Sequence, residues 1–279
     1  MPLKVRRKMR RPSVAGQFYA GDEATLRNQI ERCFLDPIGP GRVPKLAKGS
    51  RSVLGGVVPH AGLMYSGPVA AHLYGRLAED GFPETFVILG PNHTGRGSGL
   101  AITTEDFQTP FGVVKVDKDL AKELRQGLVD EDVEAHRYEH SIEIQLPFLQ
   151  YFSNDFKFVP ICMGFQDYDS AASLGKTIRS AIKGKDVVVI ASTDLSHYVP
   201  KDIAKKKDNF ALDAIKAMDA KALFRVVGEH NISMCGYGPV IATITACSGG
   251  TASLLKYATS GDVSPMSEVV GYAAVVIGK

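Results

Sequence analysis

The sequence lacks the features that mark membrane-spanning and secreted proteins. Its apolar runs are all shorter than the roughly 18 residues that span a bilayer, so we expect no membrane segment. The basic start of the chain is not followed by the apolar stretch of a secretory signal. The cysteines are few and lack paired spacing, which favours intracellular thiols over a disulfide framework; they are Cys33, Cys162, Cys235 and Cys247. These absences predict a cytoplasmic protein.

Several common catalytic signatures are also missing. There is no GxxxxGK[ST] loop, so a P-loop nucleotide site is not expected. The "GRGSG" segment after His93 lacks the strand, glycine loop and helix of a dinucleotide-binding unit. A nucleophile elbow is absent as well. A pair formed by Cys235 and a histidine, oriented by Asp194, stays open as a metal-independent hydrolase site.

The charge balance is modest, with a formal net charge of +3. Basic residues cluster in the first eleven positions, "MPLKVRRKMRR", which can be interpreted as an arm for nucleic acid or a membrane surface. Composition alone favours a solvated start of the chain. We therefore expect neither a nucleic acid nor a membrane as a partner.

At 279 residues, without internal repeats or long low-complexity linkers, the chain is predicted to form one domain over residues 1–279. Strands and helices alternate, which predicts an α/β fold with a mainly parallel or mixed central sheet and helices on both faces. We expect Ser66 to cap a helix and Pro147 to bend one. The predicted strands are 52–59, 85–90, 99–104, 112–117, 157–163, 186–192 and 269–278; the predicted helices are 22–34, 66–80, 117–128, 139–152, 170–182, 238–257 and others within 201–228.

Polar residues follow three buried-type strands. His60 ends the first, His93 follows the second, and the third continues into "STDLSH", which contains Asp194 and His197. Functional residues of α/β proteins gather at the carboxyl ends of the strands, so we expect these side chains to share a pocket.

A metal site is the first chemistry to consider, because neutral imidazole is the commonest protein metal ligand. Two histidines and one anionic ligand would leave coordination positions open. The anionic candidates are Asp194, Glu143 and Cys235. Cys235 lies in "NISMCGYGP", where helix amides could stabilise a thiolate; a small buried hydrophobe is an equally good interpretation.

The segment "EHSIEIQLP" supplies further polar groups. If it is helical, His140 and Glu143 lie on one face and line the same pocket; a half-exposed polar stripe is the alternative. His136 and His140 have the spacing of a helical metal pair, but the HExxH pattern is absent. His72 and His230 are interpreted as structural or surface residues.

Five blocks of sequence carry a family resemblance: "PHAGLMYSGPVAAHLY", "ILGPNHTG", "EHSIEIQLPFL", "STDLSHY" and "MCGYGP". Their order and spacing resemble those of the Memo family, and the likeness covers nearly the whole chain. "RRPSVAGQFYAGD" is similar to the start of family members, which favours a structured segment there over a free basic arm.

The resemblance implies a fold similar to the LigB-type class III extradiol dioxygenases, which hold iron(II) with two histidines and a glutamate. The corresponding metal ligands here would be His60, His93 and Cys235. Asp194, His197 and His140 would be catalytic residues of the pocket, with His197 an acid/base group. A thiolate in place of the carboxylate makes copper and zinc suitable beside iron, so dioxygenase activity does not follow from the fold.

The leading hypothesis is a metal-dependent oxidoreductase with an iron or copper ion that acts on a small molecule. The alternative is a non-catalytic adaptor that uses the pocket to bind a peptide or partner protein. Prokaryotic Memo relatives commonly accompany an AMMECR-domain protein and a radical-SAM protein, which the resemblance therefore implies as partners.

Overall fold

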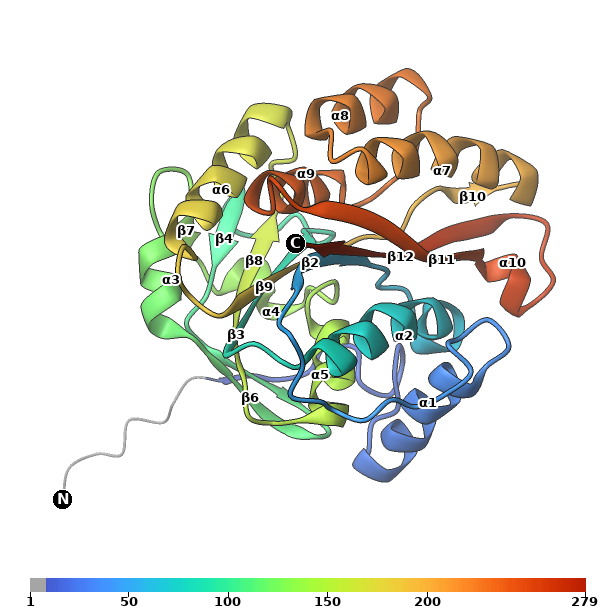
Figure 1. The fold of residues 1–279 in the computed structure, drawn as a ribbon, viewed down its shortest axis with the longest axis horizontal. Coiled ribbons are helices and arrows are strands. Elements are labelled where there is room, and N and C mark those ends of the chain that lie inside the picture. Colours follow the sequence, from blue (N-terminus) through green and yellow to red (C-terminus); the bar gives the residue numbers. More distant parts are fainter. Residues whose placement is uncertain (1–8) are drawn as a thin grey trace.

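The strands form one mixed sheet of twelve strands within residues 9–279, which the computed structural model describes (Figure 1). Its order is β1-β5-β6-β8-β3-β9-β2-β12-β10, with β11 on β12, β4 on β8 and β7 on β4. The strands are β1 (Met9–Arg10), β2 (Val53–Val58), β3 (Thr85–Pro91), β4 (Leu100–Ile102), β5 (Asp106–Thr109), β6 (Gly112–Val116), β7 (Asp130–Glu131), β8 (Lys157–Met163), β9 (Val187–Ser192), β10 (His197–Val199), β11 (Thr251–Thr259) and β12 (Val269–Gly278).

The middle of the sheet is parallel. Strands β6, β8, β3, β9 and β2 run in one direction, while β12 is antiparallel to β2, β10 and β11. All seven residues of β3 are buried, and β9 is buried from its second residue onward. Strands covered on both faces read as continuous apolar runs, which explains why these segments do not alternate.

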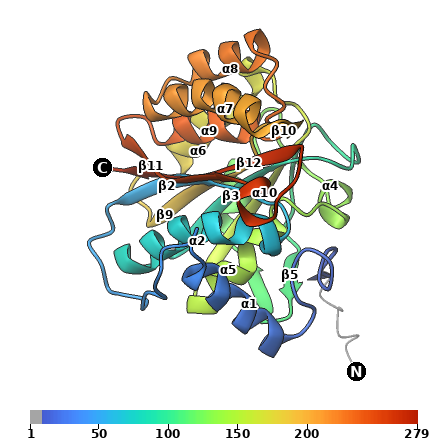
Figure 2. The same cartoon turned by 90° about the vertical axis from the view of Figure 1, so that its right-hand side faces the viewer.

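Helices cover both faces of the sheet. Figures 1 and 2 show α6, α7, α8 and α9 on one side and α1, α2 and α5 on the other. The helices are α1 (Glu23–Leu35), α2 (Leu63–Asp80), α3 (Lys118–Leu124), α4 (Glu134–Arg137), α5 (Leu146–Phe152), α6 (Tyr168–Ala181), α7 (Lys201–Lys216), α8 (Ala220–Glu229), α9 (Tyr237–Ala246) and α10 (Ser260–Val263), with a 3-10 turn η1 at Glu143–Gln145. The predicted α/β architecture is confirmed.

The helix predicted over 238–257 is wrong in its second half. Helix α9 ends at Ala246, and residues 251–259 form β11, which pairs with β12 along its length. Gly249 has a φ of +97°, a conformation that glycine adopts without a steric penalty, and it lies in the break between the two elements. Apolar residues on both sides of this glycine had made the segment look like one helix.

Two further local predictions are wrong. Residues 139–142 are not helical, and Pro147 lies at the start of α5, where its missing amide hydrogen costs nothing; it does not bend the helix. Helix α2 begins at Leu63, so Ser66 is inside it and its Oγ donates to Ala61 O at 2.7 Å without capping the helix.

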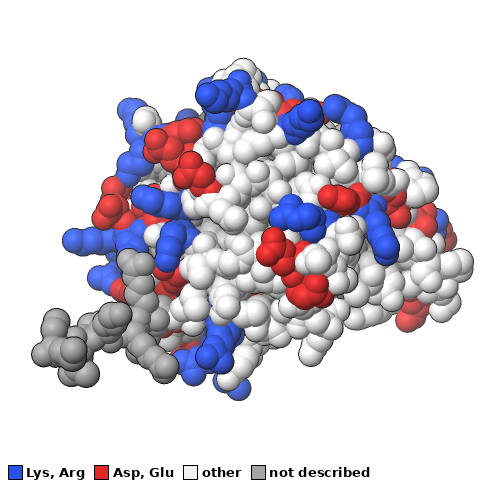
Figure 3. Space-filling view, turned by 90° about the horizontal axis from the view of Figure 1, so that it is seen from below, with Lys and Arg blue, Asp and Glu red and all other residues white. Residues whose placement is uncertain are grey.

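The basic cluster at the start of the chain falls partly outside the described residues, which begin at residue 9. Within them, Arg10 is buried and forms an ion pair with Glu143, so this part of the cluster is packed into the fold. Lys and Arg side chains lie beside Asp and Glu side chains on the face in Figure 3. Of the helices from residue 9 onward, none is both long and apolar enough to cross a membrane.

Candidate metal centre

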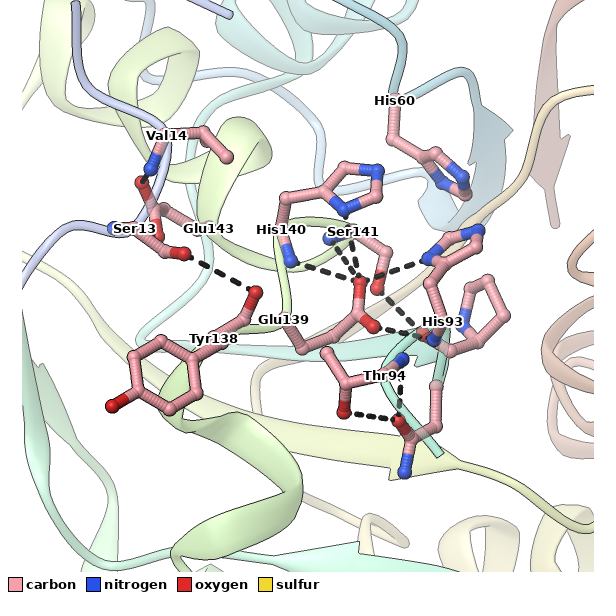
Figure 4. A network of polar contacts seen from close by, with 12 residues as sticks. Ser13, Val14, His60, His93, Thr94, Tyr138, Glu139, His140, Ser141 and Glu143 are labelled. Carbon is pink, nitrogen blue, oxygen red and sulfur yellow. Dashed lines mark hydrogen bonds and ion pairs between the residues drawn. The ribbon is translucent and has the colours of Figure 1, made fainter. Parts of the chain in front are cut away.

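The three predicted strand ends meet at one edge of the sheet. Parallel pairing aligns Val58 of β2 with Ser192 of β9, and β3 lies on the other side of β9. His60 and His93 therefore come together, and His140, from the segment between α4 and η1, lies beside them, as Figure 4 shows. The ring centre of His60 lies 5.1 Å from that of His93 and 5.4 Å from that of His140. The rings of His93 and His140 are stacked, with their centres 4.6 Å apart.

His60, His93 and Cys235 form a group suited to a metal ion. One donor atom from each lies within 4.8 Å of the other two, and Cys235 Sγ is 3.2 Å from His60 Nε2. Gly236, which precedes α9, is required for this approach, because a Cβ there would lie 2.6 Å from Ser192 O. Two nitrogens and one sulfur are a donor set for iron, copper or zinc.

The hydrogen-bond network fixes which nitrogen of His60 is free. Ser192 Oγ donates its hydrogen to Ser141 O at 2.6 Å, so it accepts from His60 Nδ1 at 2.9 Å. His60 is buried, and burial, followed by the charges of nearby histidines, holds its pKa well below the usual value. The neutral ring thus directs the lone pair of Nε2 at Cys235 Sγ, as a metal ligand requires.

Glu139 does the same for His93. Its Oε1 accepts from His93 Nδ1 at 2.9 Å, and its Oε2 accepts from His93 N (Figure 4). Burial would raise the pKa of Glu139, but the hydrogen bonds from His93 and the Ser141 amide, with the attraction of the His93 and His140 rings when they are protonated, lower it to about 2. Because a carboxylate can only accept, His93 Nδ1 carries a hydrogen, and in the neutral ring the lone pair is on Nε2. A carboxylate behind a histidine is the usual support of a metal-binding imidazole.

His197 is oriented in the same way. Its Nδ1 donates to Ser233 O at 2.8 Å, and its backbone amide donates to Ser233 Oγ at 2.7 Å. The Nε2 lone pair of His197 is therefore available at the cavity that this residue lines. His140 Nδ1 lies 3.3 Å from Glu139 Oε1, and Phe18 packs edge-on against the His140 ring at 4.9 Å.

Asp194 forms hydrogen bonds with two of the candidate ligands, His60 and Cys235. Its Oδ1 accepts from His60 N at 2.8 Å, and its own amide donates to Cys235 Sγ at 3.3 Å. Burial raises the pKa of Asp194 to about 6. Burial, with the charge of Asp194, raises the pKa of Cys235 to about 12. The amide expected to reach Cys235 from a helix thus comes from Asp194, and the side chain is a thiol in the absence of a metal.

A second cluster, His93, Glu139 and His140, also has metal-ligand spacing. Both of its carboxylate oxygens are already used, because Oε1 further accepts from the amides of His140 and Ser141 at 2.8 and 2.9 Å. A metal there would have to displace these hydrogen bonds. The group with Cys235 needs only the loss of the thiol hydrogen and fits a metal better.

Two sequence-based expectations about this segment are wrong. Glu143 is not a ligand candidate, because its carboxylate accepts from Arg10, from two backbone amides and from Tyr19 OH, away from the histidines. It does not share a helix face with His140, which precedes the 3-10 turn. His136 is buried elsewhere and contacts Ala101 O through Nε2 at 3.1 Å, in agreement with its exclusion as a ligand.

A cavity of about 700 Å³ opens over the histidines. Its imidazole floor comprises His60, His93, His140 and His197, and its apolar rim comprises Met64, Tyr65, Tyr198 and Met266. All four rim side chains are exposed, Tyr198 by 73%. No lysine or arginine lines the cavity within the described residues.

Sequence reasoning missed the residues that orient the imidazoles: Glu139, Ser192 and Ser233. All three stand within two residues of a predicted site residue in the quoted segments: Glu139 precedes His140, Ser192 opens "STDLSH", and Ser233 lies in "NISMCGYGP". That adjacency was the available signal. Which histidine nitrogen each would bind depends on the fold.

Comparison with known families gives a match over almost the whole chain. The model of the family described as Memo-like protein matches residues 10–276. A "MEMO1 family protein" of Methanococcoides burtonii is 49% identical over 275 residues, covering 96% of this chain and 100% of the relative. Another, from Methanopyrus kandleri, is 50% identical over 277 residues, covering 96% of this chain and 98% of the relative.

Among solved structures, an uncharacterised protein from Escherichia coli K12 is similar, with a TM-score of 0.54 and 13% identity. The match covers 80% of this chain and 98% of that one. At this identity the likeness shows the fold alone.

Proposed function

The chain belongs to the Memo family, and from that membership and the site geometry we propose that it binds a redox-active metal ion, iron or copper, through His60, His93 and Cys235. The observation that carries this proposal is the convergence of one donor atom from each of three residues, in separate parts of the chain, within 4.8 Å of one another. Zinc is a third candidate, because thiolate and imidazole ligands also suit it.

The site would act on a small molecule in the adjoining cavity. An iron or copper ion held there would supply redox chemistry and a Lewis acid, because three protein ligands leave coordination positions open. His197 Nε2 is free to accept a proton from a bound substrate, while Asp194 holds the backbone of His60. The lack of a lysine or arginine along the described wall favours a substrate without a carboxylate or phosphate group.

The test is element-resolved metal content after anaerobic purification without affinity-column metals. We expect near-stoichiometric iron or copper in the wild type and a loss in Cys235→Ala. Cys247→Ala is the matched control, because Cys247 is a buried thiol at the far end of α9, and it should keep its metal. A folded wild type that is free of metal and takes up neither iron(II) nor copper(I) anaerobically would overturn the proposal.

A second candidate is a recognition module in which the same cavity binds a partner without turnover. The exposed apolar rim favours it, because exposed apolar clusters often mark interaction sites. Partner binding that survives metal removal, together with no turnover in the loaded protein, would support this function. Oxygen-dependent turnover lost in His93→Ala would count against it. The AMMECR-domain and radical-SAM proteins implied by family resemblance are the first partners to test.

A further inference from the structure

A buried ion pair lies behind the imidazole floor and does not face the cavity. Arg10 and Glu143 are joined by a contact of 2.5 Å, with side-chain exposures of 4% and 0%. Burying two charges is costly, and replacing such a pair by apolar residues is often neutral or stabilising. The ion pair by itself is therefore weak evidence of a stabilising role, and its function follows from what the two side chains contact.

Arg10 binds the turn that carries the floor. Its Nε donates to His136 O at 2.6 Å, its Nη1 binds Glu143, and its Nη2 donates to Glu139 O. The planar guanidinium thus spans two backbone carbonyls and one carboxylate, a geometry that a lysine ammonium cannot reproduce. The backbone of Glu139 is fixed as a result.

Glu143 binds the N-terminal segment that packs on the same turn, residues 13–19. Besides Arg10, it accepts from Ser13 N at 2.8 Å, Val14 N at 3.1 Å and Tyr19 OH at 2.5 Å. Figure 4 shows Ser13 and Val14 beside Glu143, with Glu139 between His140 and His93. The segment held in this way leads to Phe18, which packs against the His140 ring.

The consequence is a chain of fixed contacts that ends at a proposed metal ligand. Arg10 holds the Glu139 backbone, the Glu139 carboxylate holds His93 Nδ1, and His93 Nε2 faces the site. Neither Arg10 nor Glu143 lies near enough to bind the metal. The direct route from the pair to His93 runs through Glu139, and the segment that ends in Phe18 gives a second route, to His140.

We propose that the Arg10–Glu143 pair is a positioning device for the metal site, which sets the orientation and tautomer of His93 through Glu139. This inference rests on the proposed metal-binding function. It can be tested separately from that function, because the tautomer and orientation of His93 can be measured in the metal-free protein.

The experiment uses the full chain with ¹⁵N-labelled histidine, and compares wild type with Arg10→Lys. Lysine keeps the charge beside Glu143 but cannot bind both carbonyls. Long-range ¹H–¹⁵N correlation of the metal-free protein reports which ring nitrogen of His93 carries the hydrogen. Titration with Co²⁺ then reports affinity and the visible absorption of the site.

We expect a uniform Nδ1–H tautomer for His93 in the wild type and a mixture in Arg10→Lys. Co²⁺ affinity should fall about tenfold with an altered spectrum, within the range that outer supporting residues show. Arg51→Lys is the matched control. Arg51 also donates to a carbonyl and a carboxylate, those of Gly81 and Asp186, and it should change neither readout.

Unchanged tautomer and Co²⁺ affinity in Arg10→Lys, with lowered thermal stability, would overturn the inference. If the wild type shows a uniform His93 tautomer but binds no metal, the proposed function is overturned. The positioning role is then still supported if Arg10→Lys changes the tautomer. If Arg10→Lys does not fold, Tyr19→Phe gives the decision, because it removes a single donor to Glu143 and should change the tautomer in the same direction.

Discussion

The imidazole floor and the apolar rim of the cavity differ in how they are held. Three floor histidines donate from Nδ1 to an acceptor that other contacts fix, Ser192, Glu139 or Ser233. The rim side chains are exposed, and Tyr198 has an unfavourable backbone φ of +54°. The floor thus has a fixed geometry, as metal ligands would require, and the rim is available for contact with a molecule that arrives from solution.

The largest expected effect comes from removing a floor ligand. His60→Ala should lower metal affinity by more than about 100-fold, since losing an outer supporting residue alone costs about 10–100-fold. Competition against a chelator measures it. His72→Ala is the control, because His72 bonds Ile38 O outside the site. Equal affinity in the two variants would remove His60 from the ligand set.

Replacing the carboxylate that supports His93 should have the next largest effect. Glu139→Gln removes negative charge and leaves one acceptor oxygen for four donors, so we expect metal affinity to fall about 10–100-fold. Glu131→Gln, which breaks an exposed ion pair with Arg125, should leave affinity unchanged. Metal titration followed by visible absorption of bound Co²⁺ makes the comparison, and an unaffected Glu139→Gln would show that the floor does not depend on its support.

Removing the support of His60 should be milder. Ser192→Ala leaves His60 Nδ1 without its acceptor and removes one of the acceptors of Gln145 Nε2, which keeps Pro59 O. We therefore expect a loss of about 1–3 kcal/mol in unfolding free energy and about tenfold in metal affinity. Ser196→Ala is a close control, since the buried Ser196 Oγ has no hydrogen-bond partner. In urea unfolding, Ser196→Ala should have a higher unfolding free energy than Ser192→Ala. The reverse order would contradict the hydrogen bonds assigned to Ser192.

The smallest effect is expected at the rim. Tyr198→Asn should raise the unfolding free energy by about 0.5–1 kcal/mol, because asparagine tolerates a positive φ better than tyrosine. Metal affinity should stay the same, since the floor ring that Tyr198 packs against, His197 at 5.8 Å between ring centres, is not a proposed metal ligand. Tyr198→Phe should leave both quantities unchanged. A rise in stability accompanied by loss of substrate or partner binding would identify strain kept for function. A fall in metal affinity would show that floor and rim are coupled.

Much of the site could be predicted from sequence because strand ends are recognisable. His60 and His93 follow apolar runs, and parallel pairing brings such ends together. The orienting partners were not predictable in the same way, because a hydrogen bond between Ser192 and His60 depends on strand register and side-chain direction. The helix predicted over 139–142 was wrong for a related reason. The shape of this turn depends on hydrogen bonds to the Glu139 carboxylate and from Arg10, which local helix propensity does not encode.

The separation of the ligands along the chain sets the order of events during synthesis. His60 and Cys235 are 175 residues apart, so a growing chain exposes both histidines long before the sulfur ligand exists. A metal ion that met the nascent chain would find imidazoles without the thiol or the helix that follows it. Under the proposed function, loading would therefore belong to the finished protein, and the ion would enter through the cavity mouth that the substrate would also use.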